Sequence, residues 1–211
     1  MITDRRAQTV EAAYDALGPR FGQWMAKIEG EPLDRFLEEL GSRLDTGARV
    51  LELGCGDGRT TKRLAVRFDV VGVDVSSEQL RLARAAIPET TFVHADLMEL
   101  DFPRSSFDAI TAFYVFMHVP RDDHPELLRR IHRWLKPGGV FIAPMSTVGG
   151  PDRVESWLGV QMFFSGWDAA TNGNLVRAAG LEVLVDEIVG VREPESEYET
   201  AFLWVLARKP A

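Results

Sequence analysis

The sequence predicts a single α/β domain with a parallel sheet flanked by helices, and three observations support this. The chain has 211 residues, enough for one such domain with a sizeable core and short for two. From Arg49 onward, short β-branched runs alternate with helical patterns, an order typical of βαβ units. Residues 107–115 are almost continuously apolar, as in a strand buried on both faces. We therefore expect residues 1–211 to form one domain.

The elements follow in chain order from the same alternation. In the first helix after Arg49, Leu64, Ala65 and Phe68 form an inward stripe. The hydroxyls of Ser76 and Ser77 can cap the next helix. The predicted strands are 50–53, 70–74, 91–94, 107–115, 140–143, 182–188 and 201–207, and the predicted helices are 58–68, 79–86, 125–135 and 168–179.

Two regions fall outside this alternation. Residues 1–42 carry apolar side chains at helical spacing and are expected to form one or two helices that partly cover the sheet. Residues 146–167 form a long, aromatic-rich connection, and we expect this insertion to cover a substrate. The aromatic side chains of the two regions can equally be plain core packing; they are Tyr14, Trp24, Trp157, Phe163, Phe164 and Trp167.

Composition and charge exclude several classes of protein. The chain has 24 Lys and Arg against 32 Asp and Glu, a net charge of -8, which would repel a polyphosphate, so no nucleic-acid partner is expected. A single cysteine forbids an internal disulfide. No apolar run approaches the roughly 18 residues of a membrane helix, and the N-terminus lacks the apolar core of a signal peptide. We expect a cytoplasmic protein without a membrane partner.

A glycine-rich turn is the strongest local signal of function. Residues 52–58 read Glu-Leu-Gly-Cys-Gly-Asp-Gly between a predicted buried strand and a helix, where glycines allow close backbone approach to a ligand. Asp74 ends the next strand, where an acidic side chain can accept hydrogen bonds from ribose hydroxyls. Together they indicate an adenosine-containing ligand. The Gly-x-Gly-x-Gly spacing differs from that of dinucleotide enzymes, and no Lys-Ser/Thr pair follows to hold a triphosphate.

Five segments in this order resemble the motifs of the class I S-adenosylmethionine-dependent methyltransferases of the small-molecule type: 52–58, 73–76, 95–97, 107–110 and 135–139. The resemblance implies a Rossmann-like sheet of seven strands in the order 3-2-1-4-5-7-6, with the last strand antiparallel. It also implies S-adenosylmethionine as cofactor and S-adenosylhomocysteine as product.

The same resemblance implies roles for individual residues. Glu52 and the backbone of Gly54, Cys55 and Gly56 would hold the methionine moiety, with Gly58 allowing close approach. Asp74 would hold the ribose, Val75 would pack on adenine, and Asp96 and the Leu97 amide would bind the adenine edge. Phe113 and Tyr114 would lie beside the sulfonium and the incoming methyl acceptor. Cys55 is expected to be structural rather than nucleophilic, because no histidine lies near it in sequence.

Methyl transfer to an O or N atom of the acceptor also requires loss of a proton. His118, Tyr114 or a bound water can take it, although a purely structural His118 is an open alternative. The candidate acceptor-binding residues are Tyr14, Trp24, Trp157, Phe163 and Phe164. No metal is expected, because the acidic residues and histidines lack metal-ligand spacing.

The acceptor is expected to be a small organic molecule, such as a metabolite or natural product. Residues 112–115 read Ala-Phe-Tyr-Val, not the Asn/Asp-Pro-Pro-Tyr/Phe of amino methyltransferases that act on nucleic-acid bases. Two alternatives remain: a non-catalytic module that binds S-adenosylmethionine, and a nicotinamide-dependent oxidoreductase, which the glycine spacing disfavours.

Overall fold

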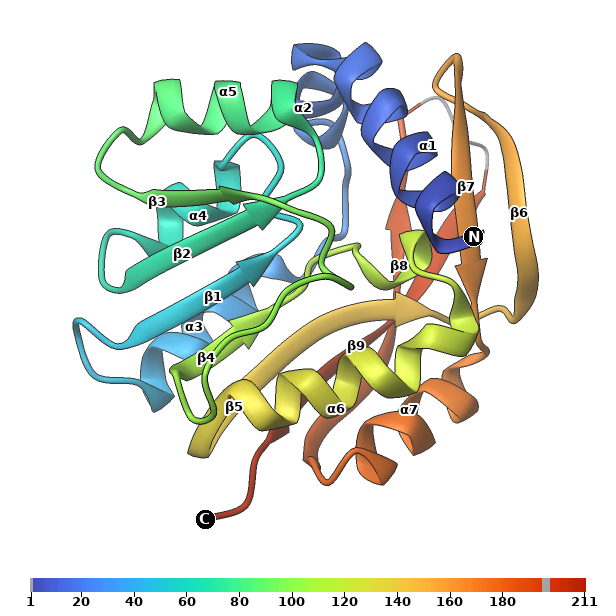
Figure 1. Ribbon diagram of the computed structural model, residues 1–211. Coiled ribbons are helices and arrows are strands. Elements are labelled where there is room, and N and C mark those ends of the chain that lie inside the picture. The colour runs from blue at the N-terminus through green and yellow to red at the C-terminus, as the bar shows by residue number, and fades with distance from the viewer. Residues whose placement is uncertain (1, 195–197) are drawn as a thin grey trace.

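The computed structural model describes residues 2–194 and 198–211, and its centre is a seven-stranded sheet (Figure 1). The strand order is β3-β2-β1-β4-β5-β9-β8. The first five strands pair in parallel, and β9 is antiparallel to both of its neighbours. The predicted fold class, strand order and antiparallel last strand are therefore confirmed. The strands are β1 (Arg49–Leu53), β2 (Asp69–Asp74), β3 (Thr91–His94), β4 (Phe107–Thr111), β5 (Leu135–Ser146), β8 (Glu182–Arg192) and β9 (Glu199–Arg208).

Helices cover both faces of the sheet, and each face has its own apolar cluster. On one face, Phe36 of α3 stacks on Trp204 of β9, with ring centroids 4.8 Å apart. On the other, Ile131 of α6 and Val176 of α7 pack in a cluster with Phe141 of β5. All five side chains are fully buried. These helices are α3 (Leu33–Arg43), α4 (Arg59–Leu64), α5 (Ser77–Ala86), α6 (His124–Trp134) and α7 (Ala169–Ala178).

The central strand β4 is shorter than the apolar run predicts. It ends at Thr111, after which Ala112 makes one more backbone bond to Ile142. Tyr114 then has φ 58°, and a short 3₁₀ turn follows at Phe116–His118. This left-handed residue turns the chain away from the sheet plane, so the apolar residues after Thr111 line a cavity instead of extending the strand.

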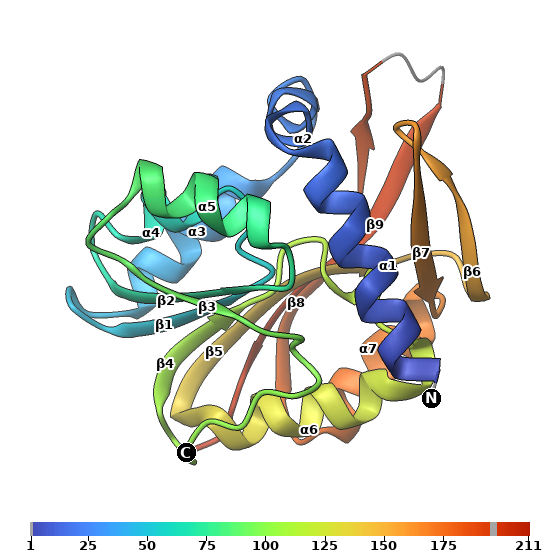
Figure 2. The ribbon, with the colours of Figure 1, turned by 45° about the horizontal axis from the view of Figure 1, so that its top comes forward.

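The N-terminal region forms three helices, α1 (Ile2–Leu17), α2 (Pro19–Met25) and α3, where one or two were expected. Gly18, with φ 48°, ends α1, and Pro19 begins α2. α1 runs past the carboxyl ends of the parallel strands (Figures 1 and 2). No helix of the described chain is long and apolar enough to cross a bilayer.

The insertion at 146–167 is a β-hairpin, formed by β6 (Gly150–Trp157) and β7 (Val160–Gly166). Its two-residue turn, Leu158-Gly159, has positive φ at both positions, which is the geometry of a type I′ turn. The hairpin packs against α1, where Met162 of β7 meets Val10 and Ala13 in a third apolar cluster. The insertion and the N-terminal helix thus form one layer beyond the strand ends (Figure 2).

Candidate active site

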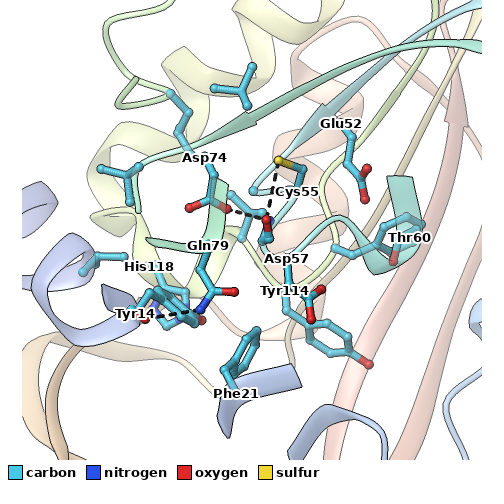
Figure 3. Close-up of a pocket in the computed structure, with 18 of the residues that line it drawn as sticks. Tyr14, Phe21, Glu52, Cys55, Asp57, Thr60, Asp74, Gln79, Tyr114 and His118 are labelled. Carbon is cyan, nitrogen blue, oxygen red and sulfur yellow. Dashed lines mark hydrogen bonds between the residues drawn. The ribbon is translucent and has the colours of Figure 1, made fainter. Parts of the chain in front are cut away.

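A cavity of about 1130 Å³, including its mouth, lies at the carboxyl ends of β1, β2 and β4 (Figure 3). Every cofactor residue proposed from the sequence lines it except Gly58. Both candidate catalytic residues, Tyr114 and His118, line it too, as does Tyr14 of α1. The fold therefore gathers at one place residues from a glycine loop, three strand ends and the N-terminal helix.

The glycine loop is fixed by packing on two sides. Gly54 has φ 66°, and a Cβ there would overlap the Val115 side chain. Gly58 has φ 81°, and a Cβ there would lie 3.0 Å from the Ala83 Cβ of α5. Gly54 therefore allows the loop to approach the end of β4, whereas Gly58 allows two helices to approach each other.

Asp74 is oriented by backbone amides at the edge of the cavity. Its Oδ2 accepts the Gly56 N–H at 2.8 Å (Figure 3). Its Oδ1 accepts the Ser76 N–H, also at 2.8 Å. Burial raises the pKa of Asp74, and these hydrogen bonds oppose that rise. A carboxylate oxygen accepts about two hydrogen bonds, so each oxygen keeps a lone pair for a ligand hydroxyl.

Glu52 is a buried carboxylate without a cation. Its side chain is 2% exposed and accepts a hydrogen bond from the Thr61 hydroxyl. No Lys or Arg of the described chain forms an ion pair with it. Burial raises the pKa of Glu52 to about 8, and the nearby Asp74 and Asp57 add to the rise. The site therefore favours a ligand cation beside Glu52.

Asp96 carries an ion pair that the sequence did not reveal. Arg6 of α1 donates to its Oδ2 at 2.7 Å, and the two side chains are 3% and 12% exposed. The Met98 N–H donates to the other carboxylate oxygen. Arg6 therefore joins the N-terminal helix to the residue that the family resemblance assigns to adenine.

Replacing Arg6 with Ala is expected to lower the free energy of unfolding by about 2 kcal/mol, since it leaves a mostly buried carboxylate unpaired at a cavity edge that water reaches. Urea unfolding followed by circular dichroism measures this change. Arg20→Ala, at an exposed site on α2, is the matched control. Equal stability of the two variants would contradict a structural role for the Arg6 ion pair.

His118 is held by both ring nitrogens. Its Nδ1 lies 2.9 Å from the Phe163 carbonyl, which can only accept, so Nδ1 carries the proton. Its Nε2 therefore accepts from the Tyr14 hydroxyl, also at 2.9 Å. Burial lowers the pKa of His118 to about 4, so the ring is neutral at physiological pH. Both ring nitrogens are therefore bonded to protein groups, one of them to Tyr14, which lines the same cavity.

Tyr114 faces Glu31, a carboxylate that lines the cavity and that sequence reasoning missed. The Tyr114 hydroxyl is buried and makes no well-formed hydrogen bond within the described chain. Burial raises the Tyr114 pKa, and the adjacent Glu31 raises it further. Burial also raises the pKa of Glu31. Tyr114 is consequently a hydroxyl donor rather than a phenolate base.

A second cavity, of about 1830 Å³ including its mouth, adjoins the first. Five residues line both cavities and mark the junction: Tyr14, Phe21, Met25, Tyr114 and His118. Three of the other aromatic residues singled out in the sequence line the second cavity: Trp24, Trp157 and Phe164. The Phe163 side chain instead lies in the apolar cluster between α1 and β7, and Trp167 donates to the Arg121 carbonyl.

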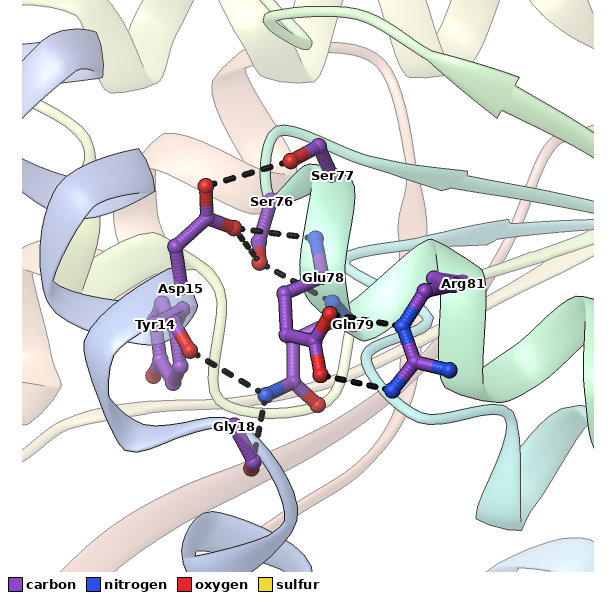
Figure 4. A network of polar contacts seen from close by, with 8 residues as sticks. All are labelled: Tyr14, Asp15, Gly18, Ser76, Ser77, Glu78, Gln79 and Arg81. Carbon is purple, nitrogen blue, oxygen red and sulfur yellow. Dashed lines mark hydrogen bonds and ion pairs between the residues drawn. The ribbon is translucent and has the colours of Figure 1, made fainter.

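Hydrogen bonds to Asp15 link the end of α1 to the start of α5 (Figure 4). The Asp15 carboxylate accepts the Glu78 N–H at 3.0 Å and the hydroxyls of Ser76 and Ser77. Ser76 in turn caps α5 as the sequence predicts, accepting the Gln79 N–H at 3.1 Å. Arg6, Tyr14 and Asp15 thus bond α1 to the rest of the protein. The helix covers the first cavity along its length.

Cys55 and His94 are held by packing and by hydrogen bonding, respectively. Cys55 is buried beside Gly72, and burial raises the pKa of its thiol, which keeps it protonated. His94 lies 2.8 Å from the Val75 carbonyl through its Nε2 and is half-exposed.

Residues 50–139, which include the glycine loop, match the model of a family described as "Methyltransferase domain". Residues 50–139 carry a methyltransferase domain, and the fold is the class I methyltransferase fold. The resemblance stated from the sequence is thereby confirmed.

Known proteins similar to this methyltransferase domain differ in what they act on. The chain is 43% identical to trans-aconitate 2-methyltransferase of Azoarcus sp. over 48% of its own length and 40% of the relative. It is 35% identical to the O-methyltransferase rstn1 of Aspergillus nomiae over 50% of each. The chain spans about half the length of these curated relatives.

Two solved structures match this chain over nearly its whole length. One is the 1,6-didemethyltoxoflavin-N1-methyltransferase of Burkholderia thailandensis with bound 1,6-didemethyltoxoflavin and S-adenosylhomocysteine. Its TM-score is 0.73 at 23% identity, covering 99% of this chain and 91% of that one. Another is the [4+2]-cyclase SpnF, with a TM-score of 0.73 at 22% identity and 97% coverage of both chains. At these identities the likeness concerns the fold.

The site residues that the sequence revealed as motifs lie mostly within residues 50–139, the segment that matches the family model. This segment contains the glycine loop, Asp74, Asp96 and His118. Arg6 and Glu31 lie before it, in a helix and a loop whose sequence carries no recognisable motif, and only the packed structure places them at the site. Tyr14 also lies before it and was predicted only as an acceptor-binding aromatic residue, without its bond to His118.

Proposed function

We propose that this chain is an S-adenosylmethionine-dependent methyltransferase that transfers a methyl group to an O or N atom of a small organic molecule. The observation that carries the proposal is the pair of adjoining cavities. One is lined by the glycine loop, Glu52 and Asp74, and the other by aromatic side chains, and they meet at Tyr14, Tyr114 and His118.

The first cavity fits the proposed cofactor by chemistry as well as by family. Glu52 is a buried carboxylate that lacks a cation, which suits the α-ammonium of a methionine moiety. Asp74 keeps lone pairs for two ribose hydroxyls. A Cβ at Gly56 would meet nothing within 4 Å, so its backbone faces open space where a ligand can approach.

Other residues would complete the binding of the cofactor. In this proposal the backbone of Gly54 and Cys55 contacts the methionine moiety, Val75 packs on adenine, and Phe113 lies near the sulfonium. Asp96 and Leu97 face the adenine edge, with the Asp96 carboxylate shared between the ligand and Arg6.

When bound, the cofactor supplies a methyl group already activated on a sulfonium, so the protein contributes mainly position. The acceptor atom must lie about 3 to 3.5 Å from the methyl carbon with its lone pair in line. Tyr14 lies at the junction with its hydrogen committed to His118, so its oxygen can accept a hydrogen bond from the acceptor. Tyr114 can donate one. Both orient the acceptor's lone pair, and a bound water would take the proton that an O–H or N–H acceptor loses.

In this mechanism His118 is a positioning residue that fixes Tyr14. His118→Asn and Tyr14→Phe are each expected to lower kcat by about tenfold, roughly 1.4 kcal/mol, with little change in KM for the cofactor. The double variant should be no slower than either single variant, because the two residues act as one unit.

The pH dependence of kcat distinguishes a positioning role of His118 from a role as general base. Because the pKa of His118 is about 4, the ring stays neutral between pH 6 and 9, and kcat should show the same pH profile in wild type and His118→Asn. A break in that range which the substitution abolishes would make His118 the base.

The proposal is tested by calorimetric titration of the purified chain with S-adenosylmethionine, S-adenosylhomocysteine and NAD. Micromolar binding of the two sulfur nucleosides, followed by release of S-adenosylhomocysteine with an acceptor library, supports it. Binding of NAD alone would support a nicotinamide-dependent oxidoreductase instead.

A second candidate function is binding of S-adenosylmethionine without methyl transfer. The fold permits it, since the matching structure of SpnF is described as a [4+2]-cyclase. Tight binding of S-adenosylmethionine with no methylated product from any acceptor would favour this candidate. The second cavity argues against a module that only senses the nucleoside, because it offers room for another molecule.

A further inference from the structure

We infer that the second cavity takes a planar aromatic molecule that carries no negative charge. The inference names the acceptor class for the proposed methyl transfer and in that sense rests on the proposed function. Its physical basis is separate: the shape, ring content and charge of the cavity itself.

Aromatic side chains from three elements meet in this cavity. The rings of Trp24, from α2, and Trp157, from β6, are 5.3 Å apart and nearly perpendicular, at 83°. Trp157 is also 6.0 Å from Phe164 of β7 at 88°, and Phe21 is 6.1 Å from Trp157. All four rings are only partly buried. They present both ring faces and ring edges to the cavity, and these favour another flat ring at offset or perpendicular geometry.

The charged groups that line the cavity are mostly acidic. In the part of the chain that the structure describes, the lining contains three carboxylates, Glu155, Glu193 and Glu199, and one cation, Arg153. The Arg153 Nε is 3.1 Å from a Glu155 oxygen, and its guanidinium lies over the Phe164 ring at 5.6 Å from the centroid. The one cation of the lining is therefore paired with Glu155, and Glu199 is paired with Arg192 at 3.5 Å.

The carboxylate nearest the junction, Glu31, has the same sign, and the nearby Arg59 is paired with Asp57. Glu31 lines the first cavity beside Tyr114, and Tyr14 and Tyr114 present hydroxyls rather than cations. An acceptor with a carboxylate, sulfonate or phosphate would lose its hydration and find no free cation among the described lining residues. A neutral or cationic ring meets no such penalty, and a cation gains from the carboxylates and ring faces.

Two fluorescent probes with the same ring skeleton test whether a negative charge weakens binding in the second cavity. N-Phenyl-1-naphthylamine is neutral, and 1-anilinonaphthalene-8-sulfonate adds one negative charge to that skeleton. We expect the neutral probe to bind at least about tenfold more tightly, because an unpaired buried anion costs more than the free energy that corresponds to a factor of ten. Equal or tighter binding of the sulfonate would overturn the inference.

Amino-acid substitutions test whether the two probes bind in the second cavity. Trp157→Ala should weaken both probes, and Glu199→Lys should strengthen the sulfonate severalfold with little effect on the neutral probe. Glu89→Lys, which changes the net charge equally at a residue that lines neither cavity, is the control and should leave both affinities unchanged. Indifference of both probes to Trp157→Ala, or an equal response to the two lysine substitutions, would overturn the assignment.

Titration of the same preparations with S-adenosylmethionine separates this inference from the proposed function. Cofactor binding together with a preference for the sulfonate would overturn the inference and leave the methyltransferase proposal standing. A preference for the neutral probe without any cofactor binding would support the cavity's ligand class and overturn the proposed function.

Discussion

Asp74→Ala is expected to weaken binding of S-adenosylmethionine by more than about 100-fold. In the proposed complex the carboxylate accepts two ribose hydroxyls, and hydrogen bonds to a charged group contribute about 1.5–3 kcal/mol each. The substitution also removes the acceptor for the Gly56 and Ser76 amides, which loosens the loop around the ligand. Calorimetry with S-adenosylhomocysteine, which lacks the reactive methyl, gives the same comparison without turnover.

Asp74→Asn is the matched variant for this test. It keeps the size of the side chain and one oxygen acceptor while removing the charge, so its loss of affinity should be smaller than that of Asp74→Ala. A folded Asp74→Ala protein that binds within threefold of wild type would show that the ribose is held elsewhere.

Binding of the cofactor near pH 7 is expected to release about one proton from Glu52. The pKa of this carboxyl is about 8 in the free protein, so it is mainly protonated at pH 7. A ligand ammonium beside it favours the ionised form and drives the proton off. Affinity should consequently increase from pH 6 to pH 8, and the release should vanish above pH 9, where Glu52 is already ionised.

The proton is counted by calorimetry in two buffers with different ionisation enthalpies. Glu52→Gln retains an acceptor for the Thr61 hydroxyl but cannot ionise, so it should abolish the buffer dependence and weaken binding by roughly 10- to 100-fold. A buffer-dependent heat that persists in Glu52→Gln would assign the proton to another group.

The sheet and the glycine loop were predictable because their signals are local. Buried parallel strands read as apolar runs, and the turn after β1 needs glycine at Gly54, where a side chain would overlap Val115. The seven-strand order came from the family resemblance, not from the pattern of residues. The apolar run predicted a β4 that is too long. The residues after Thr111 are apolar because they line a cavity and pack beneath it.

The roof of the site could not be predicted because its contacts join distant parts of the chain. Arg6 and Asp96 are 90 positions apart, and Tyr14 and His118 are 104 apart. An arginine or tyrosine on an amphipathic helix gives no sign of such a partner. The hairpin at 150–166 was likewise expected only as a cover, since its two-residue turn, Leu158-Gly159, lacks the usual Asn-Gly signal.

The third apolar cluster, between α1 and β7, holds α1 and the hairpin together as a unit distinct from the sheet. Its core residues Val10, Ala13, Met162 and Phe163 are separate from the two clusters that stabilise the sheet. Acceptor preference can therefore be redesigned by grafting α1 and the hairpin together from another protein, with Arg6 and Asp15 retained as attachment points to the sheet half. A graft of either piece alone would leave the other without its packing partner.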